Sequence, residues 1–419
     1  MIPFKSGLEY SAPARGTWNI VHIGMLIPEA HQIFVCAQGC LRGVVLTAAE
    51  MGTKQRFSTI AVRENNVLNG DLEQLIIDGT TDIIAKLPVK PPAILIYTSC
   101  IHHFMGCDLS LVYRTLAEGF PDIKFTDCYM DPIMRKSGLN TDQTMRRQLY
   151  SLLEPLPLES RLIHLAGGCF PLSRTSELYT MLTEHGFTLR EIAVCSTYEE
   201  YLQLASCGWC VTLLPAAQPA GLTLESRLGQ KHLYLPFSFN YDHITANLSL
   251  LCNALGIPVP NFTKARAACQ AALAKAYQVI GDTPVAIDYT AFPQIVSLAE
   301  LLLEQGFKVT KVFADSLMPE EKEDFALLQK RFPDLLLEPT IHSMMRIYPR
   351  KTAVKTLAIG QKAAYFTGTE HFVNIVEGGG LYGFDGISQL AQLMEEAFIT
   401  RSNTRELIQI KGMGCESCL

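Results

Sequence analysis

The sequence predicts an α/β protein with mostly parallel sheets flanked by helices, organised as three units of comparable size. Short apolar runs rich in β-branched residues alternate with longer stretches of helical spacing almost throughout the chain. The length of 419 residues gives room for two to four domains. A content of 48% hydrophobic and 18% charged residues is typical of a folded chain and excludes a disordered one.

The first unit is expected over residues 1–155. Its apolar runs predict four strands, at His31–Val35, Phe57–Val62, Ala93–Tyr97 and Ile123–Cys128. Helical spacing separates them, at Leu41–Met51, Asp71–Ala85 and Leu109–Ala117. Strands that are joined through helices pair in parallel, so this unit is expected to contain one parallel sheet.

The second unit is expected over residues 156–262. Pro155 and Pro157 mark its start, and the turn-rich segment GIPVPNF marks its end. Its expected strands are Arg161–Ala166, Glu191–Cys195, Cys210–Leu214 and His232–Leu235, and a helix over Ile244–Leu255 closes it.

The third unit, 263–400, opens with a helix over Ala265–Val279. Its expected strands are Val285–Tyr289, Val309–Phe313 and Leu335–Glu338, and its last helix is Ile387–Phe398. A polar tail over 401–419 ends in GMGCESCL.

Charge and hydropathy narrow the possible partners. The chain has 35 Lys and Arg against 41 Asp and Glu, so its net charge is −6 and no basic field attracts nucleic acid. The start lacks the pattern of a signal peptide, and no run of about 18 apolar residues follows it. We therefore expect a cytoplasmic protein without nucleic acid or membrane as its partner.

Thirteen cysteines raise the question of metal or thiol chemistry, although most are expected to be small buried side chains. The segment FVCAQGC runs from a strand into a glycine turn and a helix, which places Cys40 in the first turn of that helix. Helix N-termini favour the thiolate form that binds iron. Cys100 likewise follows an apolar strand and precedes a helix. Because the carboxyl ends of parallel strands meet at one crevice, Cys40 and Cys100 are expected to lie close together. Two structural thiols would give the same pattern.

Several segments together resemble the nitrogenase component 1 superfamily. That superfamily includes the molybdenum-iron protein subunits, their cofactor-assembly homologues and the catalytic subunits of dark-operative protochlorophyllide reductase and of the coenzyme F430 biosynthetic reductase. The segments are Gly39-Cys40 before a helix, RENNVLNG at 63–70, Thr98-Ser-Cys100, Gly106-Cys107-Asp108, LPFSF before the Ile244 helix, HFVNIV at 371–376 and GLYGFDG at 380–386. The resemblance covers most of the chain and implies three Rossmann-like domains.

The resemblance also implies an iron-sulfur cluster near a subunit interface, either 4Fe-4S or a larger P-cluster-like cluster. Cys40 and Cys100 match two of the family's ligands. The family's first cysteine has no counterpart some two dozen residues before Cys40, and Cys36 is the candidate to replace it. Since a cluster normally takes four ligands, Cys107, a partner subunit or a group other than cysteine is expected to complete the set.

Two departures from the family argue against dinitrogen reduction. Tyr382 stands where the family has its carboxy-terminal cofactor histidine, and no cysteine occurs around Pro215–Leu222. A chain without these ligands is not expected to hold the iron-molybdenum cofactor.

Other motifs have two interpretations each. Residues 378–383, GGGLYG, fit G-x-G-x-x-G, but the chain ends about one helix later, so a tight turn is favoured over a nicotinamide site. Cys207 and Cys210 have redox spacing but precede a strand, which favours core packing. Cys415 and Cys418 in the tail are candidates for metal or redox use, or for a frayed end. His102 and His103 are proton donors near a cluster or structural histidines.

The expected function is therefore that of a nitrogenase-like reductase component, a homodimer or paralogous heterodimer, that reduces a substrate in an interdomain cleft. No G-x-x-x-x-G-K-[ST] motif occurs, so a separate iron-protein-like ATPase is expected to deliver the electrons. An assembly scaffold for a cluster or metallocofactor is one alternative. A cluster-free ligand-binding or sensor protein is the other.

Overall fold

The structure is a computed structural model that describes residues 10, 12, 14, 20–130, 138–317, 319–350 and 354–404. They divide into two compact units, which are considered separately. The amino-terminal unit comprises Trp18–Cys169 and Phe187–Tyr234. The carboxy-terminal unit comprises Phe170–Gly186, residues from Leu235 onward and the described residues before Trp18. None of the helices in the described ranges combines the length and the hydropathy that a bilayer crossing requires.

The first sheet of the amino-terminal unit has four parallel strands in the order β2-β1-β3-β4. The strands are β1 His31–Ala37, β2 Phe57–Val62, β3 Ala93–Thr98 and β4 Lys124–Tyr129. The helices of this part are α1 Ile20–Gly24, α2 Gln38–Glu50, α3 Glu64–Asn69, α4 Leu72–Lys86, α5 Cys100–Phe104, α6 Leu109–Gly119 and α7 Thr141–Gln148. All four predicted strands are present.

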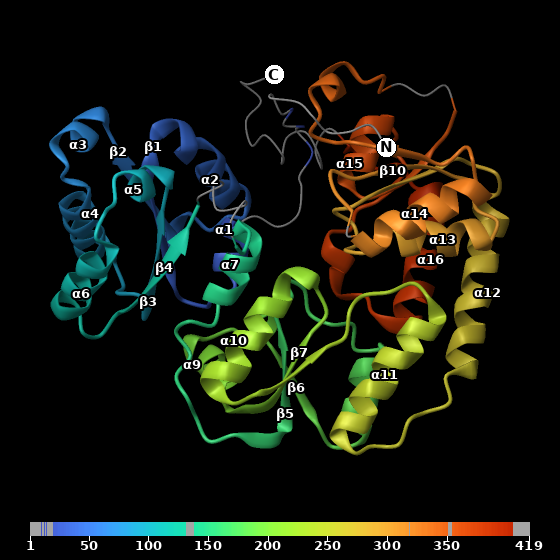
Figure 1. The fold of residues 1–419 in the computed structure, drawn as a ribbon, viewed down its shortest axis with the longest axis horizontal. Coiled ribbons are helices and arrows are strands. Elements are labelled where there is room, and N and C mark those ends of the chain that lie inside the picture. The colour runs from blue at the N-terminus through green and yellow to red at the C-terminus, as the bar shows by residue number, and fades with distance from the viewer. Residues whose placement is uncertain are drawn as a thin grey trace. The chain divides into compact units, whose positions relative to one another are not determined.

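Apolar side chains cover both faces of this sheet, because alternate residues of a strand point to opposite sides. Ile33 and Ile96 pack with the side chains of α4 and α6 on one face, and Phe34 and Tyr97 stack on the other, with ring centroids 4.0 Å apart. In Figure 1, α4 and α6 lie together on one side of the sheet, and α1, α2 and α7 lie on the other.

The second sheet of the amino-terminal unit is also parallel, in the order β6-β5-β7-β8. The strands are β5 Glu159–Ala166, β6 Thr188–Glu191, β7 Cys207–Thr212 and β8 Lys231–Tyr234, with helices α9 Tyr198–Leu202 and α10 Gln218–Leu228. Side chains from both sheets of this unit share one hydrophobic cluster.

Two predicted strands of this sheet lie at other residues. The strand expected at Glu191–Cys195 ends at Glu191, and Ile192–Val194 form a 3-10 turn in which Val194 is exposed. Strand β7 begins at Cys207 rather than Cys210. Gly208 lies within this strand, and a Cβ there would lie 2.8 Å from the Glu159 carbonyl oxygen. The absence of a side chain at this position therefore allows β5 and β7 to approach each other.

The sheet of the carboxy-terminal unit has five parallel strands in the order β11-β10-β9-β12-β13. The strands are β9 Val285–Asp288, β10 Val309–Phe313, β11 Leu336–Glu338, β12 Leu357–Ile359 and β13 Phe372–Val373. The helices are α8 Glu177–Glu184, α11 Tyr241–Leu255, α12 Thr263–Ile280, α13 Ile295–Glu304, α14 Pro319–Arg331, α15 Gln361–Thr367 and α16 Gly383–Ile399. Helix α12 packs against α16.

The three parallel sheets confirm the predicted fold class. The segment with α8 belongs to the carboxy-terminal unit because its side chains bind the start of α16. Glu177 accepts a hydrogen bond from the Asp385 amide at 2.9 Å, and the Ser173 amide donates to the Gly380 carbonyl at 2.9 Å. The expected boundaries near 155 and 262 remain a prediction.

Candidate functional site

Cys36 and Cys40 lie where β1 passes into α2. Cys36 is the sixth residue of β1, and its side chain is fully buried in the hydrophobic cluster beside Phe34. Cys40 is the third residue of α2 and is exposed. The two thiols therefore differ in access, since one faces the core and the other faces the surface.

Cys100 lies at the matching place on the neighbouring strand. It is the first residue of α5, directly after β3, and is half-buried. Strands β1 and β3 pair in parallel with Val35 opposite Thr98, so both cysteine-bearing turns lie at the carboxyl edge of one sheet. Figure 1 shows α2 and α5 at this edge.

Burial is the main cause that raises the pKa of Cys36 to about 12, and the nearby Cys40 and Cys100 add to the rise. The three cysteines share the carboxyl edge of the β1–β3 pair, because β1 runs into α2 and β3 runs into α5. A buried Cys36 is a poor thiolate, because its charged form has little solvation.

The donor set fits a cluster that is completed by further ligands. No three His, Cys, Asp or Glu side chains in the described ranges are grouped to hold a single metal ion. Thiolates of an iron-sulfur cluster bind different iron atoms and need not converge on one point. Cys40 and Cys100, at one sheet edge, would supply two of the usual four ligands if a cluster is bound.

The remaining predicted ligands lie elsewhere. Cys107 follows α5, and its pKa is raised to about 11 by burial and by the Glu73 carboxylate. Its side chain lines a cavity, and its amide donates to the His102 carbonyl at 3.0 Å. Cys415 and Cys418 fall outside the described residues.

A cavity of about 660 Å³ opens beside Cys100, at the carboxyl ends of β3 and β4. Its walls come from the end of β3, the α5–α6 segment, the end of β4 and the start of α7. The lining residues are Thr98, Ser99, His102, His103, Gly106, Cys107, Leu109, Tyr129, Leu139, Thr141, Thr144 and Arg147.

His102 is held in a fixed orientation in this wall. The Ser99 amide donates to His102 Nδ1 at 3.2 Å as part of the capping box that starts α5. Its side chain is 2% exposed, and burial lowers its pKa. Among the described residues, Nε2 has no hydrogen-bond partner. The histidine therefore has a structural role in the capping box and also lines the cavity, whereas a role as proton donor near a cluster remains a prediction.

Arg147, Tyr129 and Thr144 were not predicted as site residues. The available signal was Asn140, whose side chain accepts the Gln143 amide hydrogen and marks the start of α7. That signal predicts a helix, but it does not predict which cavity the helix borders.

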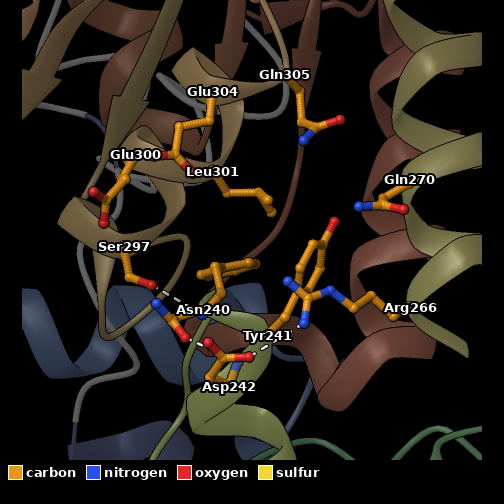
Figure 2. A pocket seen from close by; sticks show the side chains of 11 residues that line it. Asn240, Tyr241, Asp242, Arg266, Gln270, Ser297, Glu300, Leu301, Glu304 and Gln305 are labelled. Carbon is orange, nitrogen blue, oxygen red and sulfur yellow. Dashed lines mark hydrogen bonds and ion pairs between the residues drawn. The ribbon is translucent and has the colours of Figure 1, made fainter. Parts of the chain in front are cut away.

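A second cavity, of about 330 Å³, lies in the carboxy-terminal unit at the start of α11 (Figure 2). Asp242 and Arg266 form an ion pair at 3.2 Å, and the Arg266 guanidinium lies 4.9 Å from the Tyr241 ring centroid. Figure 2 shows the Tyr241 phenol pointing into the space between Gln270 and Gln305. Glu300 and Glu304 also line this cavity, so carboxylates outnumber Arg266 in its lining.

Two motifs from the sequence have structural roles. Gly378 and Gly379 have positive φ, and a Cβ on Gly378 would lie 2.6 Å from the Phe237 ring, so the segment is a tight packed turn. Cys207 and Cys210 are fully buried in β7, which confirms core packing.

Comparison with known proteins relates this fold to others. A family model described as nitrogenase component 1 type oxidoreductase matches residues 21–399. The solved structure "Nitrogenase Cp1 at pH 6.5" superposes with a TM-score of 0.67 at 14% identity, covering 94% of this chain and 95% of that one. "Nitrogenase Cp1 at pH 5" gives a TM-score of 0.62 at 14% identity, with 95% and 90% covered. No curated protein matches the chain.

Proposed function

The chain belongs to the nitrogenase component 1 type oxidoreductase family, and on that premise we propose that it is a nitrogenase-like reductase component. In this proposal it accepts single electrons from a separate iron-sulfur ATPase and reduces a substrate other than dinitrogen. The main support is the placement of Cys40 and Cys100 on adjacent parallel strands, with accessible thiols at one sheet edge.

The chain's own residues contribute ligands and an environment. Cys40 and Cys100 would hold iron as thiolates, and Cys36 is a third thiol near both of them. The cluster, 4Fe-4S or larger, supplies one-electron transfer when bound. The apolar side chains around Cys36 exclude water from one side of the site and so influence the cluster potential. The second copy of a homodimer, or a paralogous subunit, supplies the missing ligands.

Two structural features support docking of an ATPase and the absence of dinitrogen reduction. Phe104 and Met105, at the end of α5, are 69% and 47% exposed, and exposed large apolar side chains that lie together mark docking surfaces.

Tyr382 is buried, and its hydroxyl donates to the Leu235 carbonyl at 3.3 Å. This is a structural role rather than a ligand's role, which supports the absence of dinitrogen reduction.

The first experiment measures iron and sulfide in protein that is purified anaerobically. We expect Cys40→Ala and Cys100→Ala to lose the cluster absorbance. Cys195→Ala, a half-buried cysteine of the same unit, serves as the control and retains it. If Cys36→Ala loses the cluster absorbance, Cys36 is a ligand. If the variant keeps the absorbance, Cys36 is not a ligand. Wild-type protein without iron and sulfide would refute the reductase and support a cluster-free ligand-binding protein.

The second experiment separates a reductase from an assembly scaffold. The cognate ATPase with MgATP and dithionite is expected to reduce the bound cluster, as followed by electron paramagnetic resonance. Phe104→Ala should slow this reduction without changing the iron content. Leu222→Ala, an exposed leucine on α10, should leave the rate unchanged. A cluster that is not reduced by the ATPase, but is transferred to an acceptor protein, would favour the scaffold.

A further inference from the structure

The 660 Å³ cavity beside α5 has the size of a small-molecule site and the position of one. Ligand cavities in proteins are about 300–1,000 Å³. In open parallel sheets, ligands bind at the carboxyl ends of the strands, and this cavity lies at the ends of β3 and β4.

His102, one of the lining residues, carries a buried hydrogen-bond donor that lacks an acceptor among the described residues. The Ser99 amide donates to His102 Nδ1, so this nitrogen accepts and the proton of the neutral ring resides on Nε2. The side chain is 2% exposed, and no described residue accepts the Nε2 hydrogen. A buried donor without a partner is costly to the fold, so a ligand oxygen at this position would satisfy it.

Another lining residue, Arg147, is a cation without a counterion among the described residues. Arg147 of α7 lines the cavity, and no hydrogen bond or ion pair joins its guanidinium to any residue in the described part of the chain. None of the described residues that line the cavity is a carboxylate. Glu73 and Asp127 lie behind the lining, where Glu73 accepts the Asp108 amide hydrogen at 2.8 Å and Asp127 accepts the Tyr129 hydroxyl at 2.6 Å. Among the described lining residues Arg147 is the permanent charge, and it favours an anion.

The rest of the lining determines what kind of anion fits. Leu109, Leu139 and Tyr129 give the cavity apolar surface. Four hydroxyl residues add polar groups, namely Thr98, Ser99, Thr141 and Thr144. Inorganic phosphate would leave the apolar surface in contact with water. An organic acid would cover it while its carboxylate meets the guanidinium.

We propose that this cavity binds a small organic carboxylate, with Arg147 and the Nε2–H of His102 as the groups that bind its oxygens. A carboxylate matches the flat guanidinium fork in two parallel hydrogen bonds. The binding of this carboxylate is independent of the proposed function above. Its role as the molecule that is reduced rests on that function.

The test uses the full chain, purified anaerobically with its iron content measured, and benzoate as the probe. Benzoate binding is followed by ligand-detected nuclear magnetic resonance and calorimetry. Benzamide, which has the same shape without the charge, and inorganic phosphate are the comparison probes. We expect benzoate to bind at least about tenfold more tightly than benzamide and phosphate, a difference of about 1.4 kcal/mol.

The variants assign the binding to this cavity. Arg147→Gln should weaken benzoate at least about tenfold, and Arg147→Lys, which keeps the charge without the fork, should weaken it less. His102→Asn keeps an acceptor for the Ser99 amide and removes the Nε2 donor, so benzoate affinity falls while the fold is retained. Arg114→Gln, an exposed arginine on α6, should leave the affinity unchanged.

The outcomes separate the two proposals. Benzoate binding that depends on Arg147 in protein without iron would support the carboxylate site and refute the reductase. Iron-loaded protein in which benzoate does not bind, or binds equally in Arg147→Gln, would refute the carboxylate site and leave the reductase unaffected. Phosphate binding that equals or exceeds benzoate binding would refute the organic acid.

Discussion

His164 is expected to make the stability of the amino-terminal unit depend on pH. It lies in the middle of β5 with 0% of its side chain exposed. The Gln230 side chain donates its Nε2 hydrogen to the Leu204 carbonyl at 2.8 Å, so its Oε1 faces His164 Nδ1 at 3.4 Å. His164 Nδ1 therefore carries the proton. Nε2 has no partner among the described residues, and protonation would bury a charge there.

The magnitude follows from the two pKa values. Burial lowers the pKa of His164 from 6.5 to about 4, so the unfolded state binds the proton more tightly than the folded state. The stabilisation is complete above pH 6.5 and is lost as the pH falls towards 4. At about 1.4 kcal/mol per pKa unit, the total loss in free energy of unfolding is about 3 kcal/mol, of which about 2 kcal/mol is lost by pH 5.

The assay compares urea unfolding of the wild type and His164→Leu at pH 7.5, 6 and 5. Trp209 pairs with Ile163 in this sheet, so its fluorescence reports the unfolding of the region around His164. The other titrating groups, including His31, whose pKa burial lowers to about 4, are common to both proteins and cancel in the difference. The wild type should lose about 2 kcal/mol more than the variant between pH 7.5 and 5. Equal losses in the two proteins would refute the assignment of a buried neutral His164.

Two further predictions concern packing. Arg146→Met should lower the free energy of unfolding by about 3 kcal/mol in urea titrations, because the buried guanidinium binds the Gly167 carbonyl and pairs with Asp142 at 2.9 Å. A loss no larger than that of the exposed Arg114→Met would contradict it. Gly380→Ala should destabilise by about 2 kcal/mol or more, since φ is +83° and the new Cβ would collide with the Pro171 carbonyl. Gly43→Ala in α2, with nothing within 4 Å, should instead stabilise by about 0.5–1 kcal/mol, and equal thermal shifts in the two variants would overturn this reasoning.

Complete burial did not make a strand predictable from the sequence, because β12 and β13 are fully buried and were not predicted. β2 and β10 are only partly buried, yet they have the predicted ends, because Phe57–Val62 and Val309–Phe313 are rich in apolar and β-branched residues. β6 was misplaced because an edge strand is half-buried, so its alternation in Thr188–Glu191 is a weaker signal than the apolar residues that follow.

The sequence by itself determined the class of fold and the location of Cys40 and Cys100 at strand-to-helix turns, since both follow from local patterns of apolar and turn residues. Only the tertiary structure decided that β1 and β3 are neighbours, that Cys36 faces the core, and that His102 and Arg147 border one cavity. The physical reason is that strand order and cavity walls arise from the packing of segments distant in sequence. No local pattern encodes which of these segments meet.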